Sequence, residues 1–152
     1  MKILLIVFWI SGCLIIYSTV IYFFLLKLFK QNHYKTNDQY SPSISIIICA
    51  YNEEKSIASK LKNTLELDYP LEKMQVIVAD DGSTDKTVEI ANGFEFVEIL
   101  KLPRAGKTSA QNEAVKIAEN EILVFSDANN IYKVDALKKL VRNFSDERVG
   151  VV

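Results

Sequence analysis

Residues 74–85 read MQVIVADDGSTD, a short apolar run that passes directly into polar residues. The apolar part, Met74–Ala79, is bounded by turn-forming residues and predicts a buried strand. Residues 80–83 (DDGS) predict a turn. Residues 84–92 predict a helix, with Gly93 in the left-handed conformation that follows many helices. This stretch therefore predicts one strand–turn–helix unit of an α/β protein.

The same unit recurs on both sides of this stretch. Further strands are predicted at 43–50, 94–102 and 122–125, and a fifth strand is predicted to begin at 149–152. Helices are predicted at 54–67, 107–119 and 134–144. Apolar strands separated by helices indicate a mostly parallel α/β sheet with helices on both faces. Ligands bind to such sheets beyond the carboxyl ends of the strands.

The composition excludes several classes of protein. Hydrophobic residues make up 49% of the chain and charged residues 24%, which is typical of a folded protein. Lys and Arg total 18 against 19 Asp and Glu, so nothing indicates a nucleic-acid binder. Two Cys and one His cannot form a Cys/His zinc site. A metal would need oxygen ligands, which suit Mg²⁺ or Mn²⁺.

The N-terminal segment 3–26 reads ILLIVFWISGCLIIYSTVIYFFLL and contains no charged residue. At ~1.5 Å per residue it would form a helix of ~36 Å, enough to cross a bilayer core of ~30 Å. The apolar part of a cleaved signal peptide spans only ~7–15 residues. We therefore predict a retained, single transmembrane helix at 3–26.

The charges around this segment predict its orientation. Lys27, Lys30 and Lys35 follow it, whereas Lys2 and the α-amine precede it. This bias places the following domain in the cytoplasm. Residues 27–43 are predicted to form a juxtamembrane linker, because they are mostly polar and end in Ser-Pro.

Adjacent carboxylates end the strand at 74–79. Asp80 and Asp81 repel each other there, and they could accept hydrogen bonds from a ribose hydroxyl or a base N–H of a ligand. The alternative is a turn followed by a helix cap, in which Gly82 takes an unusual φ and Ser83 or Thr84 caps the helix. A helix cap could likewise explain Asn52 after the first strand.

Two further clusters follow later strands. Asp127 and Asn129 offer two oxygen ligands to a divalent cation that bridges phosphates, although strand-end capping also explains them. Residues 104–108 (RAGKT) place two cations and a flexible backbone before a helix, which suits a phosphate. A P-loop would need Gly five residues before Gly106, where Lys101 stands.

Together, these residues resemble the N-terminal half of a glycosyltransferase family 2 domain. The matching runs are IIICAYNEE at 46–54, VIVADDGSTD at 76–85, RAGK at 104–107 followed by Asn112, and FSDAN at 125–129. The resemblance covers about residues 43–152 and rests on the joint order and spacing of these runs.

The resemblance implies a Rossmann-like domain of the GT-A type that binds a nucleotide sugar. It implies that Ala50, Tyr51 and Glu53 line the nucleotide pocket. Asp81, with Asp80 beside it, is implied to bind uracil or ribose.

The resemblance also implies a phosphate and metal region. Arg104 and Lys107 are implied to approach the diphosphate or its base. Asp127 and Asn129 match the D-x-D position that holds Mg²⁺ or Mn²⁺ in this family. Asn129 replaces the second acid of that motif, which removes one negative charge.

The implied reaction is metal-dependent, inverting transfer of a sugar, expected to be UDP-linked, to the hydroxyl of a glycan or lipid acceptor at a membrane. The family's general base lies in a later half, so no catalytic base is assigned and it is expected beyond Val152. Residues 44–152 are therefore expected to be the truncated, donor-binding part of a longer enzyme, inactive alone. The alternatives are a non-catalytic, membrane-tethered α/β module and, less favoured, a P-loop-like NTPase.

Overall fold

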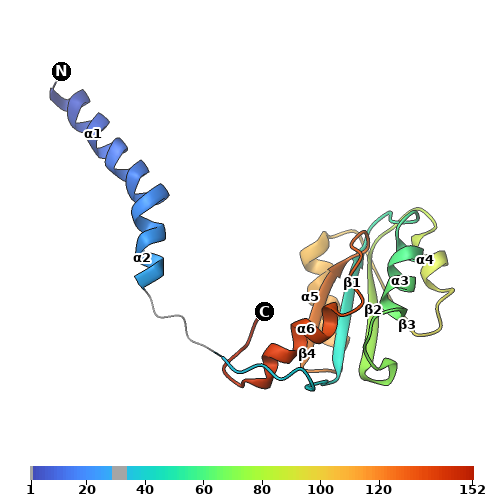
Figure 1. The fold of residues 1–152 in the computed structure, drawn as a ribbon. Coiled ribbons are helices and arrows are strands. Elements are labelled where there is room, and N and C mark those ends of the chain that lie inside the picture. The colour runs from blue at the N-terminus through green and yellow to red at the C-terminus, as the bar shows by residue number, and fades with distance from the viewer. Residues whose placement is uncertain (1, 29–33) are drawn as a thin grey trace. The chain divides into compact units, whose positions relative to one another are not determined.

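The computed structural model describes residues 2–28 and 34–152. The chain divides between Tyr34 and Lys35 into two compact units, an N-terminal helical segment and an α/β domain (Figure 1).

The N-terminal segment is helical from Lys2 to Leu28. It comprises α1 (Lys2–Ile16), a π-helical turn (Tyr17–Ile21) and α2 (Tyr22–Leu28). The side chains of Ser18 and Thr19 donate to the carbonyl of Ile15 at 3.1 and 2.7 Å, so both hydroxyls are satisfied within the helix. Residues 2–26 are long and apolar enough to cross a membrane, as the sequence predicts.

Four parallel strands form the sheet of the domain. They are β1 (Ile44–Ala50), β2 (Met74–Asp81), β3 (Val97–Leu102) and β4 (Ile122–Asp127). Their order is β3-β2-β1-β4, and β1 and β2 occupy the centre. In this register Ala50 lies beside Asp80 and Cys49 beside Asp127, so the carboxyl ends of the strands meet at one edge.

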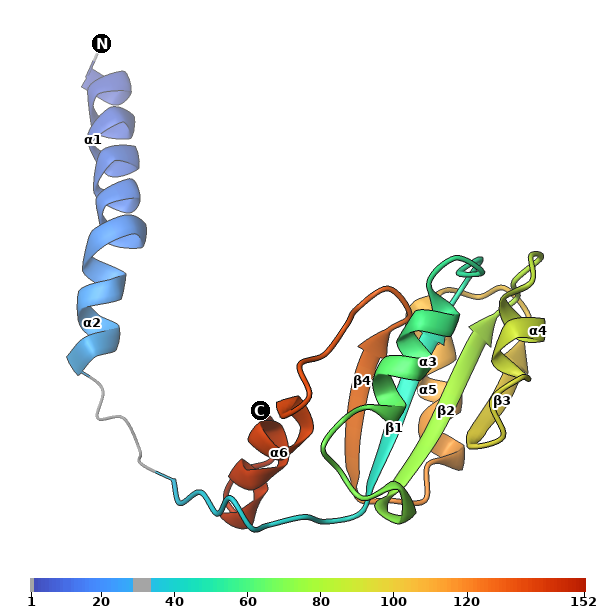
Figure 2. The same ribbon diagram turned by 45° about the vertical axis from the view of Figure 1, so that its right-hand side comes forward.

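Helices cover both faces of this sheet (Figure 2). On one face, Ile46 and Ile48 pack with side chains of α3 (Ile57–Leu65), α4 (Thr87–Ala91) and α6 (Ala136–Val141). The other face carries α5 (Lys107–Ile117), whose Ala110 and Ala114 pack against Ile47 and Ile77. Short 3₁₀ helices lie at Leu71–Lys73 and Arg142–Ser145. The predicted α/β architecture with helices on both faces is confirmed.

Several predicted details are wrong. The fifth strand is absent from the described residues, because residues 149–152 pair with no strand and Val151 is 89% exposed. Residues 150–152 instead line an apolar groove of about 440 Å³ along β4. Gly93 does not adopt the left-handed conformation; positive φ angles occur at Gly82 and Gly106.

The helices after β1 and β2 begin later than predicted, at Ile57 and Thr87. Residues between each strand and its helix also hydrogen-bond to the opposite loop, as the N–H of Glu54 does to Asp85 at 3.1 Å. Lys86 is the N-cap residue of α4, and Asp85, rather than Ser83 or Thr84, accepts the N–H of Thr87 at 3.0 Å.

The predicted linker at 27–43 lies partly outside the described residues, and its second half belongs to the α/β domain. The backbone N–H of Lys35 donates to Asp146 at 3.0 Å, and that of Asn37 donates to the carbonyl of Arg142 at 3.2 Å. Arg142 also forms an ion pair with Asp38 at 2.9 Å. Residues 35–38 are therefore fixed to the end of the domain and are not a free linker.

Candidate functional site

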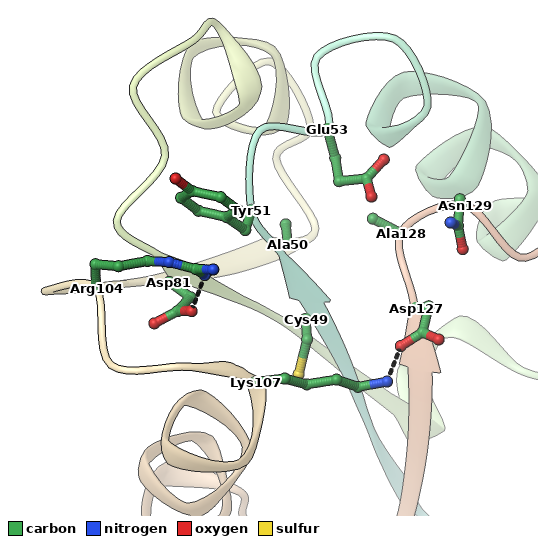
Figure 3. A pocket seen from close by; sticks show the side chains of 10 residues that line it. All are labelled: Cys49, Ala50, Tyr51, Glu53, Asp81, Arg104, Lys107, Asp127, Ala128 and Asn129. Carbon is green, nitrogen blue, oxygen red and sulfur yellow. Dashed lines mark hydrogen bonds and ion pairs between the residues drawn. The ribbon is translucent and has the colours of Figure 1, made fainter.

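A cavity of about 310 Å³ opens at the carboxyl ends of the strands (Figure 3). Its lining comes from the ends of β1, β2 and β4 and from the loop before α5. The lining residues are Cys49, Ala50, Tyr51, Glu53, Asp81, Arg104, Lys107, Asp127, Ala128 and Asn129. The cavity thus collects side chains from segments far apart in the sequence.

Asp81 organises the loop that follows β3. Its carboxylate accepts the backbone N–H groups of Ala105, at 2.8 Å, and Gly106, at 3.0 Å, and it pairs with the Arg104 guanidinium. The side chain of Asp81 is only 4% exposed. The backbone hydrogen bonds from Ala105 and Gly106, together with the charge and the side-chain hydrogen bond of Arg104, lower the pKa of Asp81. The loop amides are thus already bonded to a carboxylate, unlike those of a phosphate-binding P-loop.

Gly82 allows the loop that follows β3 to lie close to the end of β2. It has a φ of 75°, and a Cβ atom there would lie 2.8 Å from the backbone nitrogen of Arg104. Both the backbone conformation and the available space therefore require glycine at this position.

The Arg104 guanidinium also lies over the ring of Tyr51, 3.4 Å from the ring centroid. Tyr51 follows β1 and is 40% exposed. One charged wall of the cavity is therefore formed by Tyr51, Arg104 and Asp81.

The opposite wall carries a second ion pair. Lys107, the first residue of α5, places its Nζ 2.5 Å from Oδ1 of Asp127 at the end of β4. Asp127 raises the pKa of Lys107 through this hydrogen bond and its charge. Asn129 lies beyond Asp127 and is exposed at the cavity rim.

Helix α3 supports the loop that carries Asn129. Asn63 accepts the backbone N–H of Tyr132 at 2.8 Å and donates to its carbonyl at 2.9 Å. One turn earlier, the fully buried Lys60 lies over the Tyr132 ring, with Nζ 3.7 Å from the centroid. Burial lowers the pKa of Lys60 to about 8.

The loops after β1 and β2 are joined by hydrogen bonds. Asn52 accepts the N–H of Thr84 at 2.9 Å, and its own N–H donates to the Ser83 hydroxyl at 2.9 Å. The N–H of Glu53 donates to the Thr87 hydroxyl at 2.7 Å. Asn52 has a φ of 54°, so it is a bridge between the loops rather than the predicted helix cap.

Asn52→Ala is expected to lower the free energy of unfolding by about 1–2 kcal/mol. The substitution removes the side-chain acceptor of the Thr84 N–H, and alanine disfavours the positive φ of this position. Asn52→Gly restores the backbone freedom and should recover part of the loss. Urea unfolding of the full chain in detergent micelles, followed by circular dichroism, measures both. Equal stability of Asn52→Ala and the parent chain would contradict the bridging role.

The structure brings together every predicted site residue except Asp80. The carboxylate of Asp80 is buried and accepts the N–H of Ser83 at 3.1 Å, so it stabilises the turn and does not line the cavity. Neighbouring strand residues point to opposite faces, which separates Asp80 from Asp81. The sequence reasoning missed Cys49 and Ala128 as lining residues. Burial raises the pKa of the Cys49 thiol.

The oxygen atoms of the cavity fit a divalent cation that is shared with a ligand. No group of three His, Cys, Asp or Glu side chains that could hold a metal occurs among residues 2–28 and 34–152. Asp127 and Asn129 supply two oxygens, and Mg²⁺ or Mn²⁺ commonly completes its coordination with phosphate and water. This donor set suits a cation bound together with a phosphorylated ligand.

A parallel α/β sheet with a charged cavity at the carboxyl ends of its strands defines a ligand-binding α/β domain. The model of the family described as glycosyl transferase family 2 matches residues 45–152. The chain belongs to this family.

Relatives of known name are similar to most of this chain. The β-monoglucosyldiacylglycerol synthase of Nostoc sp. is 34% identical over 131 residues, which cover 81% of this chain and 28% of that protein. The chain thus spans less than a third of the length of this relative.

Two solved structures share the fold. The mannosyltransferase PcManGT from Pyrobaculum calidifontis, in complex with GDP-Man and Mn²⁺, has a TM-score of 0.78 and 32% identity, covering 86% of this chain and 41% of that one. Residues 1–349 of S. aureus TarS, in complex with UDP-GlcNAc, have a TM-score of 0.61 and 30% identity, covering 64% and 29%. The GT-A type fold predicted from the sequence is confirmed.

Proposed function

We propose that this chain forms the donor-binding part of a membrane-anchored glycosyltransferase. The enzyme would transfer a sugar from a nucleoside diphosphate sugar, UDP-linked by preference, to an acceptor hydroxyl with inversion. The observation that carries the proposal is the convergence of Asp81, Arg104, Lys107 and Asp127 on one cavity at the strand ends. Membership of glycosyltransferase family 2 supports it.

The two walls of the cavity suit the two ends of such a donor. Tyr51 presents a ring face to a nucleobase, and Asp81 and Arg104 supply an acceptor and donors for its edge or for the ribose. Lys107 carries a positive charge that would attract the diphosphate. Ala50 and Glu53 complete the lining of the cavity.

Asp127 and Asn129 would hold Mg²⁺ or Mn²⁺, which would offset the charge of the departing nucleoside diphosphate. The Mn²⁺ in the mannosyltransferase complex supports this assignment. The residues of this chain would orient the donor. A glycan or lipid acceptor fits the glycolipid synthase among the relatives. We infer a cytoplasmic position of the domain from the lysines that follow the apolar helix.

Calorimetric titration of the full chain in detergent micelles tests the proposal. UDP-GlcNAc or another UDP-sugar should bind in the presence of Mn²⁺, and UDP should bind at the same site. GDP-mannose in a parallel titration tests the preference for uracil. Absence of heat with every nucleotide, from a chain that melts cooperatively, would refute donor binding.

A further inference from the structure

Four of the five charged side chains that line the cavity form two ion pairs of different kinds, and the fifth, Glu53, accepts the Ser56 hydroxyl instead. Arg104 pairs with Asp81, whose carboxylate is buried and also held by two backbone N–H groups. Lys107 pairs with Asp127, and both side chains are about half exposed, at 56% and 43%. Within the described part of the chain, the Asp127 carboxylate has no other hydrogen-bond or ion-pair partner than Lys107. The first pair is built into the fold, whereas the second is open to exchange.

The position of Lys107 makes an exchange geometrically simple. Its side chain extends across the cavity from the start of α5, past Cys49, to the end of β4 (Figure 3). Lysine carries a compact charge on a flexible stem, so its ammonium can change partner without movement of the helix. Exposed pairs of this kind contribute little to stability and separate readily.

We propose that Lys107 is an exchangeable counter-ion of Asp127: it occupies this carboxylate in the ligand-free protein, gives it up to a divalent cation, and turns to the diphosphate of the donor. This inference rests on the proposed function. Its consequence is that the cation and the nucleotide bind cooperatively.

The sign of the cooperativity follows from the charges. While Lys107 holds Asp127, the pair is neutral and the amide of Asn129 adds no charge, so a cation alone binds weakly. A bound diphosphate attracts the ammonium away from Asp127 and restores the negative charge that a cation needs. By linkage, the cation strengthens nucleotide binding by the same factor.

Titration of the full chain with Mn²⁺ in detergent micelles tests this inference, with free Mn²⁺ measured by electron paramagnetic resonance. Without nucleotide, Lys107→Met should bind Mn²⁺ roughly tenfold more tightly than the parent chain. In the parent chain, UDP should strengthen Mn²⁺ binding roughly tenfold, after correction for Mn²⁺–UDP in a protein-free blank. In Lys107→Met this coupling should be several-fold smaller than in the parent chain, because only the ligation of Mn²⁺ by the diphosphate itself remains.

Lys116→Met is the matched control. Lys116 lies on the same helix and forms an exposed ion pair with Glu113 at 2.7 Å, outside the cavity. It should behave like the parent chain, and Lys107→Gln should repeat the result of Lys107→Met.

The two proposals fail separately. Unchanged, weaker or absent Mn²⁺ binding in a cooperatively folded Lys107→Met variant, measured without nucleotide, would overturn the counter-ion role. Tighter Mn²⁺ binding in that variant, with no binding of UDP to any chain, would support the counter-ion role and refute donor binding.

Discussion

Asp81→Ala should abolish detectable binding of UDP and UDP-sugars and should lower the free energy of unfolding by about 2–4 kcal/mol. The variant leaves the N–H groups of Ala105 and Gly106 without their acceptor. It also releases the Arg104 guanidinium from its buried partner. One substitution thus removes a proposed ligand contact and the anchor of a cavity wall. Calorimetry and urea unfolding measure the two effects independently.

Asp80→Ala is the control for this prediction. Asp80 and Asp81 are both acidic, both buried and both at the end of β2. The carboxylate of Asp80, however, accepts the N–H of Ser83 in the turn and does not line the cavity. The Asp80→Ala variant should be less stable than the parent chain but should bind nucleotides with the same affinity. Equal loss of affinity in the two variants would show that Asp81 acts only through folding.

The stabilisation by Asp81 should also depend on pH. Because its folded-state pKa lies below the ordinary value of 3.8, its contribution is present above that value. It is lost as the pH falls through the lowered pKa. The difference in unfolding free energy between the parent chain and Asp81→Ala should therefore narrow below about pH 4.

Lys60→Met should make the domain more stable, by about 1–3 kcal/mol at pH 7. The Lys60 side chain is fully buried, and its Nζ has no hydrogen-bond partner among the described residues. Contact with the Tyr132 ring offsets part of the cost of burying this charge. Methionine fills a similar volume without a charge. Urea unfolding at pH 7 measures the gain.

The pH dependence identifies the cause of this gain. Burial lowers the pKa of Lys60 from 10.5 to about 8, so the unfolded chain binds the proton more tightly between these values. The penalty is fully present below pH 8 and shrinks as the pH rises toward 10.5. The advantage of Lys60→Met should shrink over the same range. Lys62→Met, at an exposed position of α3, should show neither effect. Lower stability of Lys60→Met at pH 7 would contradict this account.

The centre of the fold was predictable because β1 and β2 are buried on both faces. The Ile-rich run of β1 and the run Met74–Ala79 need no knowledge of their neighbours to be recognised as strands. The starts of the helices were not predictable in this way. Asn52 bonds Thr84, and Asp85 bonds Glu54, so each loop takes its conformation from a segment thirty residues away.

Most residues of the candidate site could also be predicted from the sequence. Polar residues that end parallel strands must meet at one edge, so Asp81, Arg104, Lys107 and Asp127 could be grouped from the sequence. The sequence reasoning did not separate Asp80 from Asp81, although the alternation along β2 contains that information. The pairing of Lys107 with Asp127 was not predictable, because it depends on the reach of one side chain across the cavity.

Gly82 limits how the family pattern can vary in this chain. Any side chain at this position would meet the backbone of Arg104, so a substitution is viable only if the loop moves away from Asp81. Under the proposed function, a change in nucleobase preference would therefore have to arise at the exposed side chains of Tyr51 and Arg104, above this close contact.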